Sequence, residues 1–262
     1  MRQTSLKEVY KLAQKDNRVV FVGSDLGSGT LDDFKRDFPD RFFMEGVSEA
    51  HLIGMMAGLS MSGKIPYFNT IATFISRRAY EQVLLDAGLH RQNIRLIASG
   101  GGTVYAPLGP THLAMEDIAV MRTIPNMTII APSDAEEMSR LIPQTLEYQG
   151  PIYIRLAKGG DPIIHYDDNL FQIGKSIRIK KGDTVMLIGT GITTKLALTA
   201  SQILESSGIS TSVLHIHTIK PFDTETFLLM AENSKIIITI EEHIQTGGLG
   251  SVVADILAES SL

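Results

Sequence analysis

Short runs of β-branched and aliphatic residues alternate with amphipathic segments along the whole chain, and this alternation restricts the fold more than any other feature. RVVFVG (18–23), NIRLIAS (93–99) and PIYIRL (151–156) have the length and composition of buried strands. Segments with helical spacing lie between them, over 48–62 and about 73–90. Strands separated by such helices predict an α/β fold with a mostly parallel sheet and helices on both faces.

The remaining elements of this half follow the same alternation. The sequence predicts strands at 64–68 and 126–132, and helices near 31–38, over 114–122 and after Ser133-Asp134. Ser133-Asp134 is a plausible cap for the last of these helices, with Glu136 and Glu137 in its first turn.

The alternation stops at GGDPIIHYDDNLFQIGK (159–175), where Gly, Pro and acidic residues follow no sustained period. We therefore predict two three-layer α/β/α domains, over residues 1–160 and 175–262, joined by a linker over 161–174. The smaller, second domain is expected to contain strands at 183–189, 211–217 and 235–240, with helices ending near 206, starting at Asp223 and closing the chain. Three strands make a thin sheet, so either this domain is small or part of it lies beyond Leu262.

Composition excludes several kinds of site. The 262 residues contain no cysteine, which excludes disulfides, thiolate catalysis and cysteine-ligated metals. A net charge of -5 offers no overall attraction to nucleic acid or anionic lipid. The N-terminus has helical spacing and is no signal peptide, and no run reaches the roughly 18 apolar residues of a membrane span. We expect a cytoplasmic protein without a membrane or nucleic-acid partner.

Two glycine-rich stretches follow strands. GTGITT (189–194) lacks the third glycine and the lysine of nucleotide-binding loops, so a tight turn is the better interpretation. SGGGTVYAPLGPTH (99–112) contains three consecutive glycines, which implies close backbone approach or positive φ at the ligand-binding end of a strand. We favour a functional loop here, with His112 as a candidate for proton transfer to or from a substrate.

The other titratable candidates are Glu49 and a histidine pair. His215 and His217 alternate on a strand, but no third ligand has a recognisable spacing, so we predict no metal site. Glu49 follows Ser48, a candidate N-cap, and a carboxylate at that position often serves only the helix dipole. The helix behind it is almost entirely apolar or glycine, which predicts a buried helix and a partly desolvated carboxylate suited to proton chemistry.

Several ordered motifs resemble the pyrimidine-binding and C-terminal domains of transketolases and the related 1-deoxyxylulose-5-phosphate synthases. They are EGVSEAHLIGMMAGLSMSG (45–63), ATFISRRAYEQVLLD (72–86), LGPTHLAMEDIAVMRTIPNMTIIAPSDAEE (108–137), IKPFD (219–223) and EEHIQTGGLGSVVADIL (241–257). The third motif is the most specific, because it covers a loop, a helix, a strand and the next helix cap in one register. The resemblance spans nearly the whole chain.

The resemblance implies roles for matching residues. Glu49 would hydrogen-bond pyrimidine nitrogen N1′ of thiamine diphosphate and favour the imino form that deprotonates thiazolium C2. Phe74 would pack around the pyrimidine, with Tyr80 at a nearby aromatic position. His112 would lie beside the reacting substrate atoms, and Arg155 would clamp a sugar phosphate.

The chain lacks the G-D-G…N motif with which this family binds Mg2+ and the diphosphate. The nearest string, Lys181-Gly182-Asp183-Thr184, lacks the second glycine. The resemblance therefore implies a separate N-terminal subunit that carries the motif and holds Mg2+, with the cofactor between the two chains. Family analogy also implies self-association of this subunit, giving a heterotetramer that acts on a small sugar substrate.

On the substrate side, the chain departs from the transketolase pattern. Leu108 stands where an aspartate usually reads a donor hydroxyl, and Gly100 lies where a substrate-contacting histidine is expected. Arg77 or Arg78 falls where a second aromatic ring is usual. Since buried polar pairing discriminates hydroxyl groups, ordinary pentose phosphates are not the expected substrates.

The resemblance implies an enzyme that transfers a two-carbon ketol unit between sugar (phosphate) substrates. Three further hypotheses stay open beside it. The closest enzymatic alternative is the beta subunit of a 2-oxo acid dehydrogenase, which shares the fold and the division of the site. A non-catalytic scaffold subunit and a stand-alone α/β binding protein are alternatives of another class. Retention of Glu49 and His112 argues against the scaffold.

Overall fold

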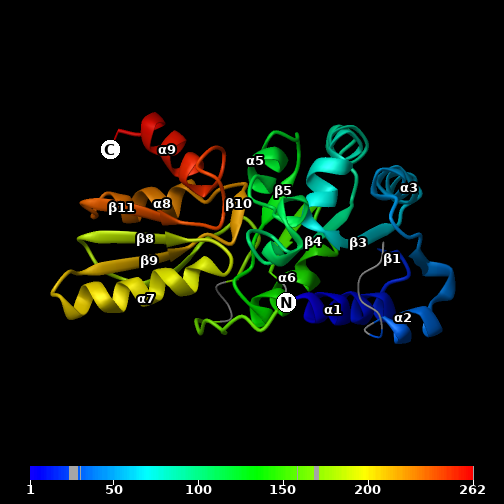
Figure 1. Cartoon of the computed structure of the whole chain (residues 1–262), viewed down its shortest axis with the longest axis horizontal. Helices are drawn as coiled ribbons and strands as arrows, with labels where there is room; N and C mark the ends of the chain where they lie inside the picture. Colours follow the sequence, from blue (N-terminus) through cyan, green and yellow to red (C-terminus); the bar gives the residue numbers. More distant parts are fainter. Residues whose placement is uncertain (24–28, 30, 158, 168–170, 262) are drawn as a thin grey trace.

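The computed structural model of the chain describes residues 1–23, 29, 31–157, 159–167 and 171–261. It contains two sheets that lie beside each other along the long axis of the molecule, each flanked by helices (Figure 1). The predicted α/β class and the two-domain architecture are confirmed. Residues 168–170 of the predicted linker lie outside the described residues.

The first sheet has seven strands in the order β10-β5-β6-β4-β3-β1-β2. These strands are β1 (Val19–Gly23), β2 (Phe42–Met44), β3 (Ile65–Ile71), β4 (Arg95–Ser99), β5 (Thr128–Ile130), β6 (Ile152–Leu156) and β10 (Thr218–Lys220). All the pairs are parallel except β10 with β5, which is antiparallel. The predicted, mostly parallel sheet is confirmed.

Helices cover both faces of this sheet because its strands are apolar on both sides. Val19 and Phe21 of β1 pack with α1 (Arg2–Lys15), α2 (Asp32–Asp37) and α6 (Ala135–Thr145). Val20 and Val22 point the other way and pack with α3 (Glu49–Met61), α5 (Asp117–Arg122) and the helical segment after Phe74. Asp134 Oδ1 accepts hydrogen bonds from the backbone N–H groups of Glu136 and Glu137, so the predicted cap of α6 is confirmed.

The segment expected as one helix over 73–90 is divided. A π-helical turn, η2 (Phe74–Arg78), precedes a short α-helical turn, α4 (Tyr80–Gln82), and a second π-helical segment, η3 (Val83–Leu89). The wider turn of a π-helix changes the direction of the following side chains, and such turns occur often at functional sites. The sequence spacing alone does not reveal this change. Helix α5 also starts at Asp117, three residues later than predicted.

Between these elements the chain forms short 3₁₀ turns: η1 (Pro39–Arg41), η4 (Ala106–Leu108) and η5 (Pro110–His112). The last two belong to the glycine-rich loop that follows β4.

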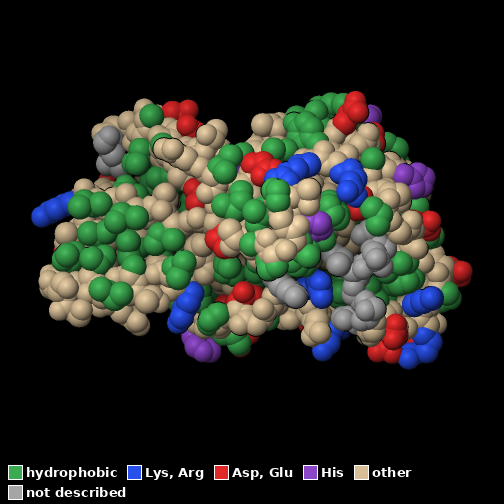
Figure 2. All heavy atoms as spheres, in the orientation of Figure 1, with side chains coloured by type: hydrophobic (Ala, Val, Ile, Leu, Met, Phe, Trp, Pro, Cys, Tyr) green, Lys and Arg blue, Asp and Glu red, His purple; other side chains and the backbone are tan. Residues whose placement is uncertain are grey.

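The second sheet has four strands, in the order β11-β8-β9-β7, so the expectation of three strands was wrong. Strands β8 (Val185–Gly189), β9 (Thr211–His215) and β11 (Ile236–Ile240) are parallel, and β7 (Ile177–Lys180) adds an antiparallel edge. Its helices are α7 (Thr193–Ser206), α8 (Thr224–Ala231) and α9 (Leu249–Glu259). Figure 2 shows hydrophobic side chains over this part of the molecule, and Ile236 and Ile238 of β11 are exposed.

The two sheets are joined by more than the linker. Strand β10 follows β9 in the sequence but pairs with β5 of the first sheet. Within the linker, Ile164 and Phe171 are buried, and the Ile164 N–H donates to Asp134. None of the helices in the described part of the chain combines the length and the apolar character that crossing a membrane requires.

Candidate active site

Glu49 starts α3 and is buried, with an exposed fraction of only 1%. Its Oε2 accepts a hydrogen bond of 3.0 Å from Nη1 of Arg78, whose side chain is half exposed. Its Oε1 is also buried and has no hydrogen-bond partner among the residues that the structure describes. Helix α3 does begin directly after Ser48, but the Ser48 hydroxyl makes no capping bond and instead donates to the Glu45 carbonyl. The carboxylate is thus desolvated, and one of its oxygens is free.

Phe74 and His112 come together beside Glu49. The guanidinium carbon of Arg78 lies 4.2 Å from the centroid of the Phe74 ring, and the Phe74 ring meets the His112 ring edge-on at 5.4 Å. Arg78 therefore contacts both Glu49 and Phe74, and Phe74 in turn contacts His112. Residues 49, 74 and 112, from three separate segments, form one continuous group with Arg78.

Arg77 fixes the loop that presents His112. It donates hydrogen bonds to the Pro110 and Leu113 carbonyls at 3.0 and 2.8 Å, and it forms an ion pair with Glu116. The hydrogen bond from Arg77 lowers the pKa of Glu116. On the loop itself, the Thr111 hydroxyl lies 2.9 Å from His112 Nδ1. The two consecutive arginines of η2 thus reach two different parts of the site. Sequence reasoning did not assign them to the site, although their closeness to Phe74 in the sequence could have indicated it.

Tyr80 takes no part in these contacts. Its hydroxyl lies 2.8 Å from the Thr123 hydroxyl at the end of α5, and its ring packs against the core. Its expected place near the cofactor stays a prediction.

Arg155, the expected sugar-phosphate clamp, is bonded within its own chain. It is buried on β6, where Nε donates to the Asp117 carboxylate at 2.9 Å and Nη2 donates to the carbonyls of Ala114 and Glu242. Burial alone would lower the pKa of Arg155, but the attraction of Asp117 outweighs burial and raises it. The guanidinium thus joins α5, the glycine-rich loop and the second domain, and its contact with a sugar phosphate stays a prediction.

The run Gly100-Gly101-Gly102 approaches side chains of its own chain. The ligand-binding role of the loop stays a prediction. A Cβ at Gly100 would lie 2.2 Å from the Tyr105 ring, and one at Gly101 would lie 2.6 Å from Arg155. A Cβ at Gly102 would lie 2.6 Å from the Glu242 side chain of the second domain. The predicted close approach exists, but tight packing accounts for it. Leu108, further along the loop, is exposed.

Helix α3 is not buried all round, contrary to the prediction from its apolar composition. His51, Gly54, Gly58 and Met61 are exposed and recur at helical spacing along one side. The opposite side, with Leu52, Ile53 and Met56, packs in the core. An apolar helix that leaves such a stripe open within one chain has a surface suited to another chain.

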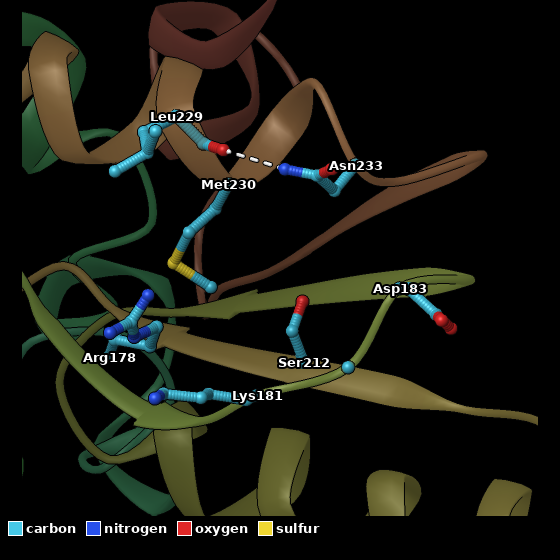
Figure 3. A pocket seen from close by; sticks show the side chains of 8 residues that line it. Arg178, Lys181, Asp183, Ser212, Leu229, Met230 and Asn233 are labelled. Atoms are coloured by element: carbon cyan, nitrogen blue, oxygen red, sulfur yellow. Dashed lines mark hydrogen bonds between the residues drawn. The ribbon is translucent and has the colours of Figure 1, made fainter.

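Outside this group we considered a metal site and a second pocket. Within the described ranges, no group of three or more His, Cys, Asp or Glu side chains is arranged to hold a metal ion. A pocket of about 390 Å³ lies in the second domain, where Arg178, Lys181 and Ser212 face α8 (Figure 3). It shares no residue with the Glu49 group.

The arrangement fits the pyrimidine half of a thiamine diphosphate site. A buried carboxylate oxygen without a partner can bond a ring nitrogen, because unpaired buried polar atoms are costly. The Phe74 ring offers an apolar contact, and the His112 ring can exchange protons with a substrate.

Comparison with known proteins gives the family. The chain matches the model for the transketolase pyrimidine-binding domain over residues 1–160 and the model for the transketolase C-terminal domain over residues 174–262. The 6-deoxy-6-sulfo-D-fructose transketolase subunit SqwH of Clostridium sp. (strain MSTE9) is 36% identical, over 99% of this chain and 81% of the relative. An apulose-4-phosphate transketolase subunit of Phocaeicola vulgatus is 35% identical, over 99% of this chain and 84% of the relative.

Solved structures agree with this result. A structure described as a split gene transketolase, inactive beta4 tetramer, has a TM-score of 0.91 and 35% identity, over 100% of this chain and 85% of that chain. A transketolase from Pichia stipitis has a TM-score of 0.77 at 19% identity, over 97% of this chain and 43% of that chain, which shows the shared fold alone.

Proposed function

The chain belongs to the transketolase family, and from this premise we propose that it is one subunit of a thiamine diphosphate-dependent enzyme that transfers a two-carbon ketol unit between sugar substrates. The observation that carries the proposal is the buried Oε1 of Glu49, which lacks a hydrogen-bond partner within the described chain. The family's cofactor has a ring nitrogen that would satisfy this oxygen. When bound, thiamine diphosphate supplies an electron sink for the transferred unit.

The residues of this chain would prepare the site. Glu49 would share a proton between Oε1 and the pyrimidine nitrogen of the bound cofactor, and burial would strengthen that hydrogen bond. Phe74 covers the pyrimidine and excludes water, and His112 exchanges a proton with an oxygen of the sugar. These roles are the ones that the family resemblance implies, and the contacts of Glu49, Phe74 and His112 around Arg78 support them.

A second polypeptide would complete the site. The chain contains no G-D-G sequence, so the ligands of Mg2+ and the diphosphate must come from elsewhere. Two relatives are described as transketolase subunits, which supports a split enzyme. We expect the partner to carry the G-D-G motif with its downstream asparagine.

Self-association through α3 is part of the same proposal. The exposed stripe of His51, Gly54, Gly58 and Met61 would allow close helix packing, and the related split transketolase chain is described as a beta4 tetramer. Pairing of two such subunits, each with its partner, would give a heterotetramer.

The substrate would be a specialised ketose. Leu108 replaces the aspartate expected to contact a donor hydroxyl, and Gly100 replaces a histidine expected to contact the substrate, so neither position offers a side chain that can form hydrogen bonds. Two relatives are named as transketolase subunits for 6-deoxy-6-sulfo-D-fructose and for apulose 4-phosphate.

Calorimetry with thiamine diphosphate and Mg2+ tests the proposal, using this chain alone, the partner alone and the mixture. We expect weak or no binding by this chain alone and saturable binding by the mixture. Ketol transfer by the mixture would support the transketolase assignment, whereas decarboxylation of 2-oxo acids would favour the dehydrogenase alternative. Failure of the mixture to bind the cofactor would contradict the proposed function.

A further inference from the structure

We infer that Arg78 is a positioning residue for Glu49: it holds Oε2 so that Oε1 faces the cofactor. This inference rests on the proposed function and extends it to a residue that does not itself react. It starts from an asymmetry between the two oxygens of one carboxylate. Oε2 accepts the 3.0 Å hydrogen bond from Arg78, and Oε1 has no partner in the described part of the chain.

The asymmetry determines how Arg78 can act. If the guanidinium occupied both oxygens, the cofactor would have to displace it. With only Nη1 on Oε2, the arginine can stay in place while a ring nitrogen bonds Oε1. A bond to Oε2 also restricts rotation of the carboxylate, so Oε1 keeps one direction.

Arg78 also compensates a buried charge. A carboxylate with no exposed side-chain surface needs an opposite charge or several hydrogen bonds. In the described structure, the contact with Arg78 is the ion pair of Glu49. The neighbouring Arg77 is occupied by Glu116 and by two carbonyls of the His112 loop, so it is not placed to substitute.

The guanidinium is itself held in place. Its carbon lies 4.2 Å from the Phe74 ring centroid, within the range of a cation–π contact. Phe74 and Arg78 are the first and last residues of η2, so the π-helical turn brings the ring and the guanidinium together. A planar guanidinium can stack on the ring and bond the carboxylate at once, which an ammonium group cannot do.

An ordinary surface ion pair shows the contrast. Arg36 pairs with Asp33 and Asp37, and the Arg36 and Asp33 side chains are both largely exposed. Such pairs contribute little because water screens them. The Arg78 pair differs because its carboxylate is fully buried, so Arg36→Met is a matched control for Arg78→Met.

A first experiment uses this chain alone and is independent of the proposed function. Urea midpoints are measured for wild type, Arg78→Met, Glu49→Gln and the double variant. We expect Arg78→Met to lower the midpoint clearly in the wild-type background and little in the Glu49→Gln background, because the amide needs no counter-charge. Arg78→Lys should lie between wild type and Arg78→Met. Equal effects of Arg78→Met in both backgrounds would overturn the inference.

A second experiment measures thiamine diphosphate affinity of the complex with the partner by calorimetry. Arg78→Met should weaken binding by roughly ten- to a hundredfold, the range expected for a hydrogen bond to a charged group. Arg78→Lys should restore part of the affinity, and Arg36→Met should leave it unchanged. In the Glu49→Gln background, Arg78→Met should have no further effect, since its action passes through Glu49.

The outcomes separate the two proposals. If the wild-type complex binds no cofactor while the urea coupling is present, the proposed function fails but the contact is real. If the wild-type complex binds normally and Arg78→Met weakens binding equally with Glu49 and with Gln at position 49, Arg78 acts on the cofactor directly and the positioning role is wrong.

Discussion

Glu137 of α6 and His215 of β9 meet where the first domain packs on the second, and His215 Nε2 lies 3.0 Å from both oxygens of the Glu137 carboxylate. Both side chains are completely buried. The Thr194 hydroxyl lies 2.6 Å from His215 Nδ1, and the Tyr166 hydroxyl of the linker donates to Glu137. Burial alone would raise the pKa of Glu137, but the attraction of His215 outweighs it and lowers that pKa to about 2. The contact between Glu137 and His215 therefore links the two domains and stabilises their interface.

Glu137→Leu should lower the free energy of unfolding by about 3 kcal/mol, because it leaves His215 and the Tyr166 hydroxyl buried without their partner. Urea denaturation measures the loss. Glu136→Leu is the control: this neighbouring carboxylate is half exposed in its contact with Arg140, so its loss should cost below about 1 kcal/mol. Similar losses for both variants would show that the interdomain pair is not stabilising.

His217 makes the fold sensitive to acid. Burial lowers its pKa from 6.5 to about 4, against the opposing attraction of Glu137 and Asp223 and together with repulsion from His215. The unfolded chain therefore binds this proton first, and stability should fall by up to about 3 kcal/mol as pH drops from 6.5 to 4. The lowered pKa of Glu137 adds a loss with the same sign between pH 4.5 and 2.

Urea titrations at several pH values check this dependence. His217→Leu should flatten the curve between pH 6.5 and 4. An unchanged slope in this variant would assign the acid sensitivity to other groups.

Glu49→Gln should reduce ketol transfer by the assembled complex at least about 100-fold, because the amide cannot exchange the proton at the position of Oε1. Circular dichroism of the variant should match that of wild type. Glu45→Gln, an exposed carboxylate four residues earlier, should retain full activity. Full activity of Glu49→Gln would remove the catalytic assignment.

Alanine substitutions at Gly100 and Gly109 distinguish the cost of backbone strain from the cost of a steric clash with a neighbouring side chain. Their φ angles are +81° and +82°, but a Cβ at Gly100 would collide with the Tyr105 ring, whereas one at Gly109 would meet no atom of the described residues within 4 Å. Gly109→Ala should therefore cost about 1–3 kcal/mol from strain, because its ψ of −176° places it in a region that is essentially restricted to glycine. Gly100→Ala should cost about 1–3 kcal/mol more from overpacking. Thermal or urea unfolding of the two variants makes the comparison, and equal losses would contradict the packing role of the glycine run.

Gly58→Glu tests self-association through α3. A Cβ at Gly58 meets no atom within 4 Å in the part of the chain that the structure describes, so a single chain should tolerate the side chain. A closely packed second copy would have to bury the new charge, so the variant should dissociate into smaller species in sedimentation experiments. Glu81→Gln, a surface change on α4, should sediment like wild type. An unchanged mass for Gly58→Glu would place the interface elsewhere.

Local patterns predicted the features that depend on neighbours in the sequence. The alternation of apolar strands and amphipathic helices indicated an α/β architecture, and the short polar side chain of Asp134 indicated where α6 begins. The apolar composition around Glu49 predicted its burial. The same reasoning failed for the outer side of α3, because composition does not show which side of a helix its own chain covers.

The four-stranded second sheet escaped prediction because β7 has only one fully buried residue, and its charged residues, such as Arg178 and Lys180, hide the strand pattern. Strand β10 has only three residues, too few for a period. Its pairing with β5 depends on how the domains pack.

The order of residues by itself determined the family, the alternating architecture and the identities of Glu49, Phe74 and His112 as candidates, because these follow from short motifs and local periodicity. Only the tertiary structure decided that Arg78 pairs with Glu49, that Asp117 occupies Arg155, and that Glu137 joins His215. These contacts link residues 29, 38 and 78 positions apart. Two charged side chains that are far apart in the sequence come into contact only when the chain folds and water is excluded around both. A local sequence pattern therefore does not show which residues will pair.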